Sequence, residues 1–254
     1  MNNKPLKKFG QNYLTDRNTI LKIVKKFAPN KNDNIIEIGP GRGALTRELI
    51  KFSDNVTAIE IDNRVIERLV EKFPSVSFIN DDFLKIELKH FTHNQKLRIV
   101  GNIPYNITSP IIFKLIENRN IISDALLMVQ YEVAKRITAV PNTKEYGILA
   151  VILNYFAETN LEFKIAPSVF SPKPKVDSAI ITLKFNKLIN AEFDDEHFIN
   201  VVKASFGNRR KTLKNSLKNS IFSDKDFSQL KTDLTKRAEN LTIDDYVILA
   251  KELQ

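Results

Sequence analysis

The residue types best suited to chemistry lie in one short stretch, Gly101-Asn102-Ile103-Pro104-Tyr105-Asn106. An asparagine oxygen accepts hydrogen bonds from an amine, a proline removes a backbone donor and fixes φ, and a tyrosine ring offers a face for stacking a base. This combination suits the exocyclic amine of a nucleobase, a poor nucleophile whose lone pair is delocalised into the ring. The alternative is an ordinary turn in which Tyr105 packs on the core.

The apolar pattern around this stretch predicts the elements that position it. Residues 97–100 have the pattern of a short buried strand, and residues 109–117 have that of a helix. In an open α/β sheet, ligands bind beyond the carboxyl ends of the strands. We therefore expect Asn102, Pro104 and Tyr105 to face a ligand site.

A glycine-rich loop follows another predicted strand, residues 34–38. The loop is Gly39-Pro40-Gly41-Arg42-Gly43, and its glycines allow a tight bend and close approach to a ligand. Glu60 lies 21 residues past Gly39, a spacing at which a carboxylate takes ribose hydroxyls. The glycines alone do not separate a dinucleotide from S-adenosylmethionine, and a tight turn without a ligand is a further alternative.

Further apolar runs predict the rest of an α/β sheet. Asp82 follows one such run, where its carboxylate either takes the amino group of an adenine or caps the next helix. The other expected strands are residues 56–59, 76–79, 125–129, 161–165 and 179–185, and the other expected helices are 44–51, 131–139, 148–156 and one that Asp16 or Asn18 caps and Pro29 ends. Only helical patterns follow residue 187. We predict a sheet domain over residues 1–186 and a small helical domain over 187–254.

The connector between the last two expected strands, residues 167–175, contains three prolines and two lysines. Prolines make it stiff and extended, and the lysines attract phosphate. Phe170, within it, is either a plug in the core or a second stacking surface.

The formal net charge of +9 over 254 residues is unevenly distributed. Residues 1–26 hold seven basic residues and one acid, and a second basic group lies near the other end. Such clusters suit a polyanion, and nucleic acid is favoured over the alternative of a solvated surface. The residues expected to bind it are Lys4, Lys7, Lys8, Arg209, Arg210 and Lys211.

The composition also excludes several classes of site. There is no cysteine and there are only three histidines, so disulfides, thiolate metal sites and histidine-based triads are not expected. We expect no metal. No apolar run approaches the length of a membrane span, and the first residues lack the pattern of a secretory signal, so the expected location is the cytoplasm.

Five segments together resemble the ribosomal RNA adenine dimethyltransferases. They are Phe9-Gly10-Gln11-Asn12-Tyr13-Leu14, Glu37-Ile38-Gly39-Pro40-Gly41, Asn102-Ile103-Pro104-Tyr105-Asn106, residues 168–178 and residues 209–213. The runs 206–217 and 237–241 are similar to the branch that acts on small-subunit rRNA. The resemblance implies a Rossmann-like methyltransferase sheet with a small C-terminal all-helical domain. It implies S-adenosylmethionine-dependent dimethylation of N6 of two adjacent adenosines in a hairpin loop near the 3′ end of that rRNA.

The resemblance also assigns roles by position. It implies cofactor contacts for Asn12, Leu14, Gly39, Gly41, Glu60 (ribose), Asp82 (adenine) and Asn102, and a catalytic group of Asn102, Pro104, Tyr105 and Phe170, the last two as a base-stacking pair. The expected partner is an immature small ribosomal subunit, and the expected enzyme is a monomer that takes part in subunit biogenesis. Two alternatives stay open: a large-subunit rRNA methyltransferase of the antibiotic-resistance type, and an assembly factor for which methylation is secondary.

Overall fold

The computed structural model of the chain describes residues 11–187 and 193–254. Contacts between residues divide the chain into two compact units. The first unit runs to Ala134 and includes Asn160–Asn186, and the second consists of Lys135–Thr159 and Lys187–Gln254. The predicted domain division at 186/187 stays a prediction. The grouping by contacts adds Lys135–Thr159 to the C-terminal helices, which sequence periodicity did not indicate.

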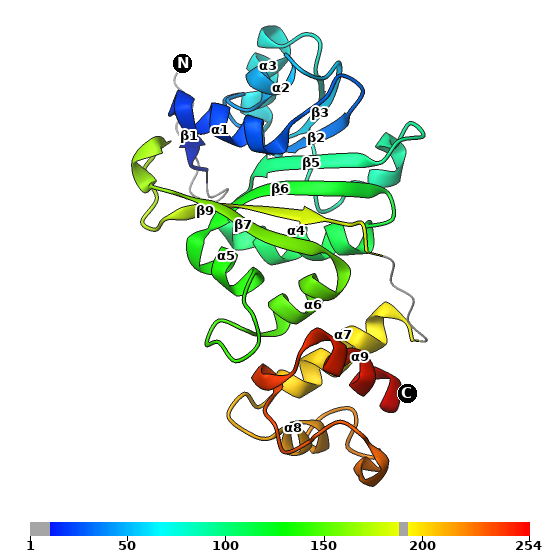
Figure 1. The fold of residues 1–254 in the computed structure, drawn as a ribbon. Helices are drawn as coiled ribbons and strands as arrows, with labels where there is room; N and C mark the ends of the chain where they lie inside the picture. Colours follow the sequence, from blue (N-terminus) through cyan, green and yellow to red (C-terminus); the bar gives the residue numbers. More distant parts are fainter. Residues whose placement is uncertain (1–10, 188–192) are drawn as a thin grey trace. The chain divides into compact units, whose positions relative to one another are not determined.

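The first unit is built on a mixed sheet of seven strands in the order β4-β3-β2-β5-β6-β9-β7 (Figure 1). The strands are β2 (Asn34–Ile38), β3 (Asn55–Ile59), β4 (Ser77–Ile79), β5 (Leu97–Asn102), β6 (Ile122–Gln130), β7 (Glu158–Ile165) and β9 (Ser178–Lys184). Strands β4 to β6 run parallel, and β9 runs antiparallel to β6. The expected α/β sheet is therefore confirmed. The strand order reverses between β2 and β5, the kind of position at which such sheets bind ligands.

Three of the four helices of the first unit begin within two residues of where the sequence predicts them, and the fourth, Asn63–Lys72, was not predicted. They are α1 (Arg17–Phe27), α2 (Thr46–Leu49), α3 (Asn63–Lys72) and α4 (Thr108–Glu117), with 3₁₀ turns at Leu88–Phe91, Tyr105–Ile107 and Pro167–Val169. Of the two caps considered for α1, the structure uses Asp16, whose Oδ2 accepts from the Thr19 N–H at 2.7 Å. Helix α5 (Tyr131–Ile137) follows β6 directly.

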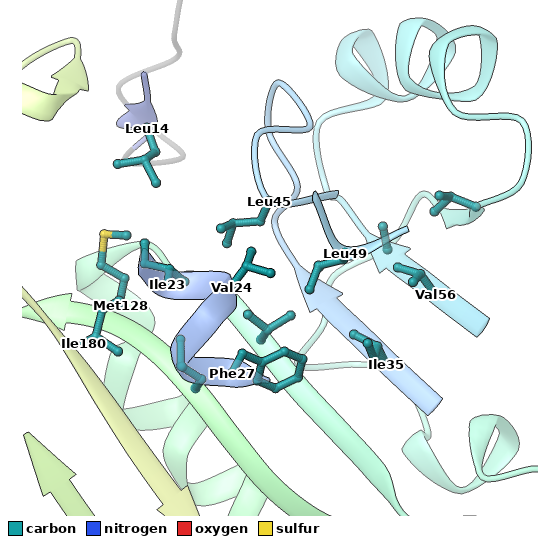
Figure 2. Close-up of a cluster of buried hydrophobic side chains, with 14 of the residues drawn as sticks. Leu14, Ile23, Val24, Phe27, Ile35, Leu45, Leu49, Val56, Met128 and Ile180 are labelled. Carbon is teal, nitrogen blue, oxygen red and sulfur yellow. The ribbon is translucent and has the colours of Figure 1, made fainter. Parts of the chain in front are cut away.

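The core of this unit forms where α1 packs on the sheet. Ile23, Val24 and Phe27 come from one face of α1, as the helical spacing predicts, and they join Ile35 of β2 in a buried cluster (Figure 2). Leu14 belongs to the same cluster. Burying a side chain of this size stabilises the fold by roughly 1.5–3 kcal/mol. The segment just before α1 is thereby held by the core.

A second, two-stranded sheet pairs that segment with the proline-rich connector. Strand β1 (Tyr13–Leu14) runs antiparallel to β8 (Phe170–Ser171), so that Leu14 lies opposite Phe170. The Thr15 N–H and hydroxyl both donate to the Val169 carbonyl at 2.9 Å. Neither strand was predicted, because two residues carry no periodicity.

The second unit is helical, apart from the start of β7. Its helices are α6 (Ile148–Phe156), α7 (Asp195–Phe206), α8 (Leu213–Lys218) and α9 (Ile243–Glu252), with 3₁₀ turns at Phe227–Gln229 and Ala238–Asn240. Tyr155 stacks on Phe198 with 3.9 Å between ring centroids, which ties α6 to α7. No helix in the described ranges is long and apolar enough to cross a membrane.

Candidate active site

The carboxyl ends of β2, β3, β4 and β5 surround a pocket with about 750 Å³ of empty space, counted out to its open mouth. Its lining residues are Gln11, Asn12, Tyr13, Ile38, Gly39, Gly41, Ile59, Glu60, Ile61, Asp81, Asp82, Phe83, Asn102, Ile103, Pro104, Tyr105 and Ile107. Most of the predicted site residues are therefore brought together, from four strand ends and the segment before α1. Among the predicted cofactor and catalytic residues, Leu14 and Phe170 do not line it.

The glycine loop has the backbone that its sequence predicts. Gly39, Gly41 and Gly43 have φ of +64°, +55° and +74°, a region that L side chains rarely adopt. A Cβ on Gly41 would lie 2.9 Å from the Tyr13 ring, and one on Gly43 would lie 2.4 Å from the Phe73 ring. A side chain at Gly41 or Gly43 would therefore force its aromatic neighbour to move, in addition to the backbone strain that it would have at all three glycines.

Glu60 lies at the end of β3 with its side chain turned back to the loop. The residue is only 5% exposed, and its carboxylate accepts from the N–H groups of Gly41 (3.2 Å) and Asp62 (3.0 Å). Burial raises the pKa of Glu60, while these backbone hydrogen bonds oppose the rise. A carboxylate has about four acceptor positions, so Glu60 has capacity for hydroxyl donors from a ligand as well.

Asp82 and an apolar wall complete the side of the pocket beyond β3 and β4. The Asp82 carboxylate accepts from the Leu84 N–H at 2.9 Å, which caps a turn and not the helix that was considered from the sequence. It also lines the pocket, where its ligand role stays a prediction. Ile61 is 48% exposed beside it and offers an apolar surface to a flat ring.

Asn102 occupies the end of β5, next to the glycine loop. Its side-chain Nδ2 donates to the Asn12 carbonyl at 2.8 Å. This bond uses one of the two donor hydrogens of the amide, points the NH2 group toward Asn12 and leaves the amide oxygen as an acceptor for a ligand. Pro104 follows with φ of −59° and no N–H, so the turn adds carbonyl groups to the pocket.

Tyr105 is half-buried, and its ring lines the pocket. Its hydroxyl lies 2.7 Å from the hydroxyl of Ser178, which is fully buried at the start of β9. Burial raises the pKa of the Tyr105 hydroxyl, which therefore stays neutral at physiological pH. The sequence analysis did not single out Ser178 as a partner, because this contact joins segments far apart in the chain.

Leu14 and Phe170 lie in the core. They face each other across β1 and β8, and they are 6% and 5% exposed. Of the two positions considered for Phe170, the structure shows the plug, and its stacking role stays a prediction. Leu14 belongs to the buried cluster and directly follows Asn12 and Tyr13, so its burial anchors the segment that lines the pocket.

Two polar groups at this site were not predicted. Glu37 is 1% exposed in β2 and accepts from the Thr46 hydroxyl at 2.6 Å, and burial raises its pKa to about 7. Gln11 accepts from the Tyr13 hydroxyl (2.9 Å) and donates to Asp62 (3.0 Å), tying the segment before α1 to the start of α3. A charged residue inside an apolar strand was the available signal for Glu37, whereas nothing local marked Gln11.

The predicted RNA-binding residues have different surroundings. Lys4, Lys7 and Lys8 lie outside the described residues. Arg209 pairs with Glu239 (Nε to Oε2, 3.0 Å) and donates to the carbonyls of Lys144 and Tyr146, all within the second unit. Arg210 and Lys211 are exposed. The described ranges hold no group of three or more histidine, cysteine or acidic residues that would bind a metal ion.

Comparisons with known proteins agree with this geometry. The model of the family described as ribosomal RNA adenine dimethylase matches residues 2–254. "Ribosomal RNA small subunit methyltransferase A" of Chlorobium phaeobacteroides (strain DSM 266) is 46% identical over 98% of this chain and 91% of its own length. The protein of that name from Francisella tularensis subsp. novicida is 46% identical, with 98% of both chains covered.

Two solved structures are similar over nearly the whole chain. A dimethyladenosine transferase from Plasmodium falciparum has a TM-score of 0.78 at 26% identity, covering 93% of this chain and 95% of that one. The 23S rRNA methyltransferase ErmE has a TM-score of 0.74 at 28% identity, covering 95% and 99%. The expected fold class and family resemblance are confirmed.

Proposed function

Because this chain belongs to the ribosomal RNA adenine dimethylase family, we propose that it transfers methyl groups from S-adenosylmethionine to N6 of two adjacent adenosines in small-subunit rRNA. The observation that carries the proposal is that the Asn102–Tyr105 turn and the Glu60 carboxylate line one pocket. One end of the pocket suits a nucleoside cofactor and the other suits a base. The small subunit is favoured because relatives at 46% identity carry that name.

The lining residues fit this cofactor. Glu60 would accept from the ribose hydroxyls, Asp82 from the adenine amino group, and Ile61 would cover the adenine face. The glycine loop and the Asn12 backbone would hold the methionine part, in space that a Cβ at Gly41 would disturb through Tyr13. When bound, S-adenosylmethionine supplies an electrophilic methyl group on a positively charged sulfur.

The turn after β5 would hold the target amine. The Asn102 oxygen and the backbone carbonyls beside Pro104 accept hydrogen bonds from N6 and stabilise the positive charge that the nitrogen gains. Tyr105 provides a face for the adenine ring, which must leave its stack to reach the pocket. No strong base is needed, since the nitrogen loses its proton readily once it is charged. Catalysis is then mainly positioning and electrostatic stabilisation.

Two finer points belong to the same proposal. The partner is an immature small-subunit particle, which exposed cations such as Arg210 and Lys211 suit. The enzyme acts as a monomer in the cytoplasm. The large-subunit alternative is less well supported, because the ErmE structure is 28% identical, against 46% for the small-subunit relatives.

Labelled methyl transfer to purified ribosomal subunits that lack this modification tests the proposal. Both subunits would be offered separately, and the modified nucleotides mapped by mass spectrometry. We expect N6,N6-dimethyladenosine at two adjacent positions near the 3′ end of small-subunit rRNA. Label confined to large-subunit rRNA would support the alternative, and label in neither would remove the proposed activity.

A further inference from the structure

A groove rich in cations adjoins the pocket within the first unit. Two neighbouring hollows share Arg42 and Lys72 and lie among α1, the glycine loop, α2 and α3; we call them the basic groove. Its charged lining residues are Arg17, Arg42, Arg47, Lys51, Arg68, Lys72 and one acid, Glu48. That acid pairs with Lys51 at 2.5 Å. The groove therefore has a strong excess of positive charge.

In the described part of the chain, three of these cations form no ion pair. Within the described ranges, no carboxylate lies within ion-pair distance of Arg17, Arg42 or Arg47. Lys72 donates to the Arg42 carbonyl at 3.5 Å, and burial together with the nearby charge of Arg47 lowers the pKa of Lys72. Gathering like charges in this way is unfavourable, and an anion bound in the groove would relieve it.

The basic groove is continuous with the pocket. Tyr13 and Gly41 line both, and the Arg42 guanidinium lies 4.6 Å from the centroid of the Tyr13 ring. An RNA strand whose base enters the pocket must run along the neighbouring surface. The arginines of the groove are suited to that strand, because a guanidinium pairs with phosphate oxygens through two parallel hydrogen bonds.

We propose that the basic groove binds the sugar–phosphate backbone of the rRNA near the target adenosines. This rests on the proposed function and names a surface that the sequence did not reveal. Of its cations only Arg17 belongs to one of the two basic clusters, and RNA binding was predicted for other residues of those clusters. An acidic protein is the competing occupant. Continuity with a site that takes a nucleotide base favours RNA.

The test compares two double variants that lose the same charge. Arg17→Gln/Arg47→Gln removes two exposed cations of the groove, neither of which lines the pocket. The control, Lys85→Gln/Lys96→Gln, removes two exposed cations that line neither the groove nor the pocket. Binding of wild type and both variants to unmethylated small-subunit particles is measured across a range of KCl concentrations, with cofactor affinity and melting temperature measured alongside.

The slope of log K against log [salt] is negative, and for the groove variant we expect its magnitude to be smaller by about 1.4–1.8. Each lost phosphate contact removes about 0.7–0.9 from this magnitude. If wild type and the groove variant bind equally in 1 M salt, the affinity of the variant in 0.1 M salt should be about 25- to 60-fold lower than that of wild type. The control keeps the wild-type slope, and cofactor affinity stays the same in both variants.

Equal slopes for the groove variant and the control would overturn the groove assignment. If wild type still methylated the particles, the proposed function would stand. A wild-type protein that methylated neither subunit would overturn the function and, with it, this assignment. Poly-glutamate binding that needed Arg17 and Arg47, with RNA binding unaffected by them, would assign the groove to an acidic protein instead.

Discussion

Two buried glutamates near the glycine loop have different tasks. Glu60 is held by two backbone N–H groups and lines the pocket, whereas Glu37 is bonded to Thr46 behind the loop. The first is placed to contact a ligand. The second acts on the loop, because Thr46 opens α2 directly after it.

Replacing Glu60 with glutamine should weaken cofactor binding. The change keeps the side-chain volume and removes the charge that strengthens hydrogen bonds from ribose hydroxyls, a loss of about 1.5–3 kcal/mol, or roughly 10- to 150-fold in Kd. Calorimetric titration with S-adenosylmethionine measures it. Glu67→Gln, on the exposed side of α3, is the matched control. Equal dissociation constants for the Glu60 and Glu67 variants would remove Glu60 from the cofactor site.

Glu37 should make folding stability fall as pH rises. Its pKa is raised from 4.5 to about 7, so between these values the folded protein holds a proton that the unfolded chain has lost. Stability then decreases through this window by on the order of 3 kcal/mol. In Glu37→Gln the decrease between pH 5 and pH 8 should be smaller than in wild type, as measured by urea unfolding. If the free energy of unfolding decreased equally in wild type and Glu37→Gln, this would contradict the raised pKa of Glu37.

Among the elements, the loop after β2 has the strictest backbone requirement. Gly43 combines φ of +74° with a Cβ position 2.4 Å from the Phe73 ring. Gly147, which precedes α6, has extended backbone and nothing within 4 Å of a Cβ. The two glycines therefore differ in how an alanine would fit.

We expect Gly43→Ala to lower stability by at least about 2 kcal/mol, since the left-handed backbone costs roughly 1–2 kcal/mol and the clash adds to it. Gly147→Ala should change it by less than about 1 kcal/mol. Thermal unfolding of both variants checks this. A Gly43→Ala protein as stable as Gly147→Ala would show that the loop tolerates a side chain.

Most of the long elements were predictable because each carries its own signal, but α3, with ten residues, was not predicted. Apolar runs marked β2 and β6, and Asp16 with Pro29 marked the ends of α1. Strands β1 and β8 were not predictable, since their pairing joins residues more than 150 positions apart. The same pairing places Phe170 in the core, and local sequence left two positions open for it.

The site residues were likewise predictable only where the local sequence carried a signal. Residues that follow predicted strands were assigned to a ligand site, Glu60 from its spacing to Gly39 and Asn102 from its place after a strand, and the family resemblance joined them in one site. The contacts between distant side chains, Gln11 with Asp62 and Tyr105 with Ser178, have no local pattern that would reveal them. No local pattern indicates that Arg17, Arg42 and Arg47 line one groove either.

Across the whole chain, some basic residues form contacts inside the protein and others are exposed. Arg209 is engaged with Glu239 and two carbonyls inside the second unit, whereas Arg210 and Lys211 are exposed. We therefore expect adjacent members of one basic cluster to have different roles.

Arg209→Gln should lower the stability of the second unit by about 1 kcal/mol, because its ion pair is partly exposed and the bonds to carbonyls are lost. Arg210→Gln/Lys211→Gln should leave the melting temperature unchanged and reduce the salt slope of RNA binding by about 1.4–1.8. Thermal unfolding and RNA titration on the same samples check both. If Arg209→Gln reduced the salt dependence of RNA binding and left the melting temperature unchanged, Arg209 would be assigned to RNA binding instead of to stability.

In the proposed enzyme, one pocket holds the cofactor while the turn after β5 presents the adenine. Single-turnover methyl transfer to small-subunit particles, with saturating cofactor, tests it in wild type, Tyr105→Phe and Tyr105→Ala, with melting temperatures measured on the same proteins. Tyr105→Phe keeps the ring face and loses only the bond to Ser178, so it should retain most of the rate. Tyr105→Ala loses about 1–3 kcal/mol of stacking, which predicts a rate lower by roughly one to two decades. A folded Tyr105→Ala protein that methylates at the wild-type rate would contradict the claim.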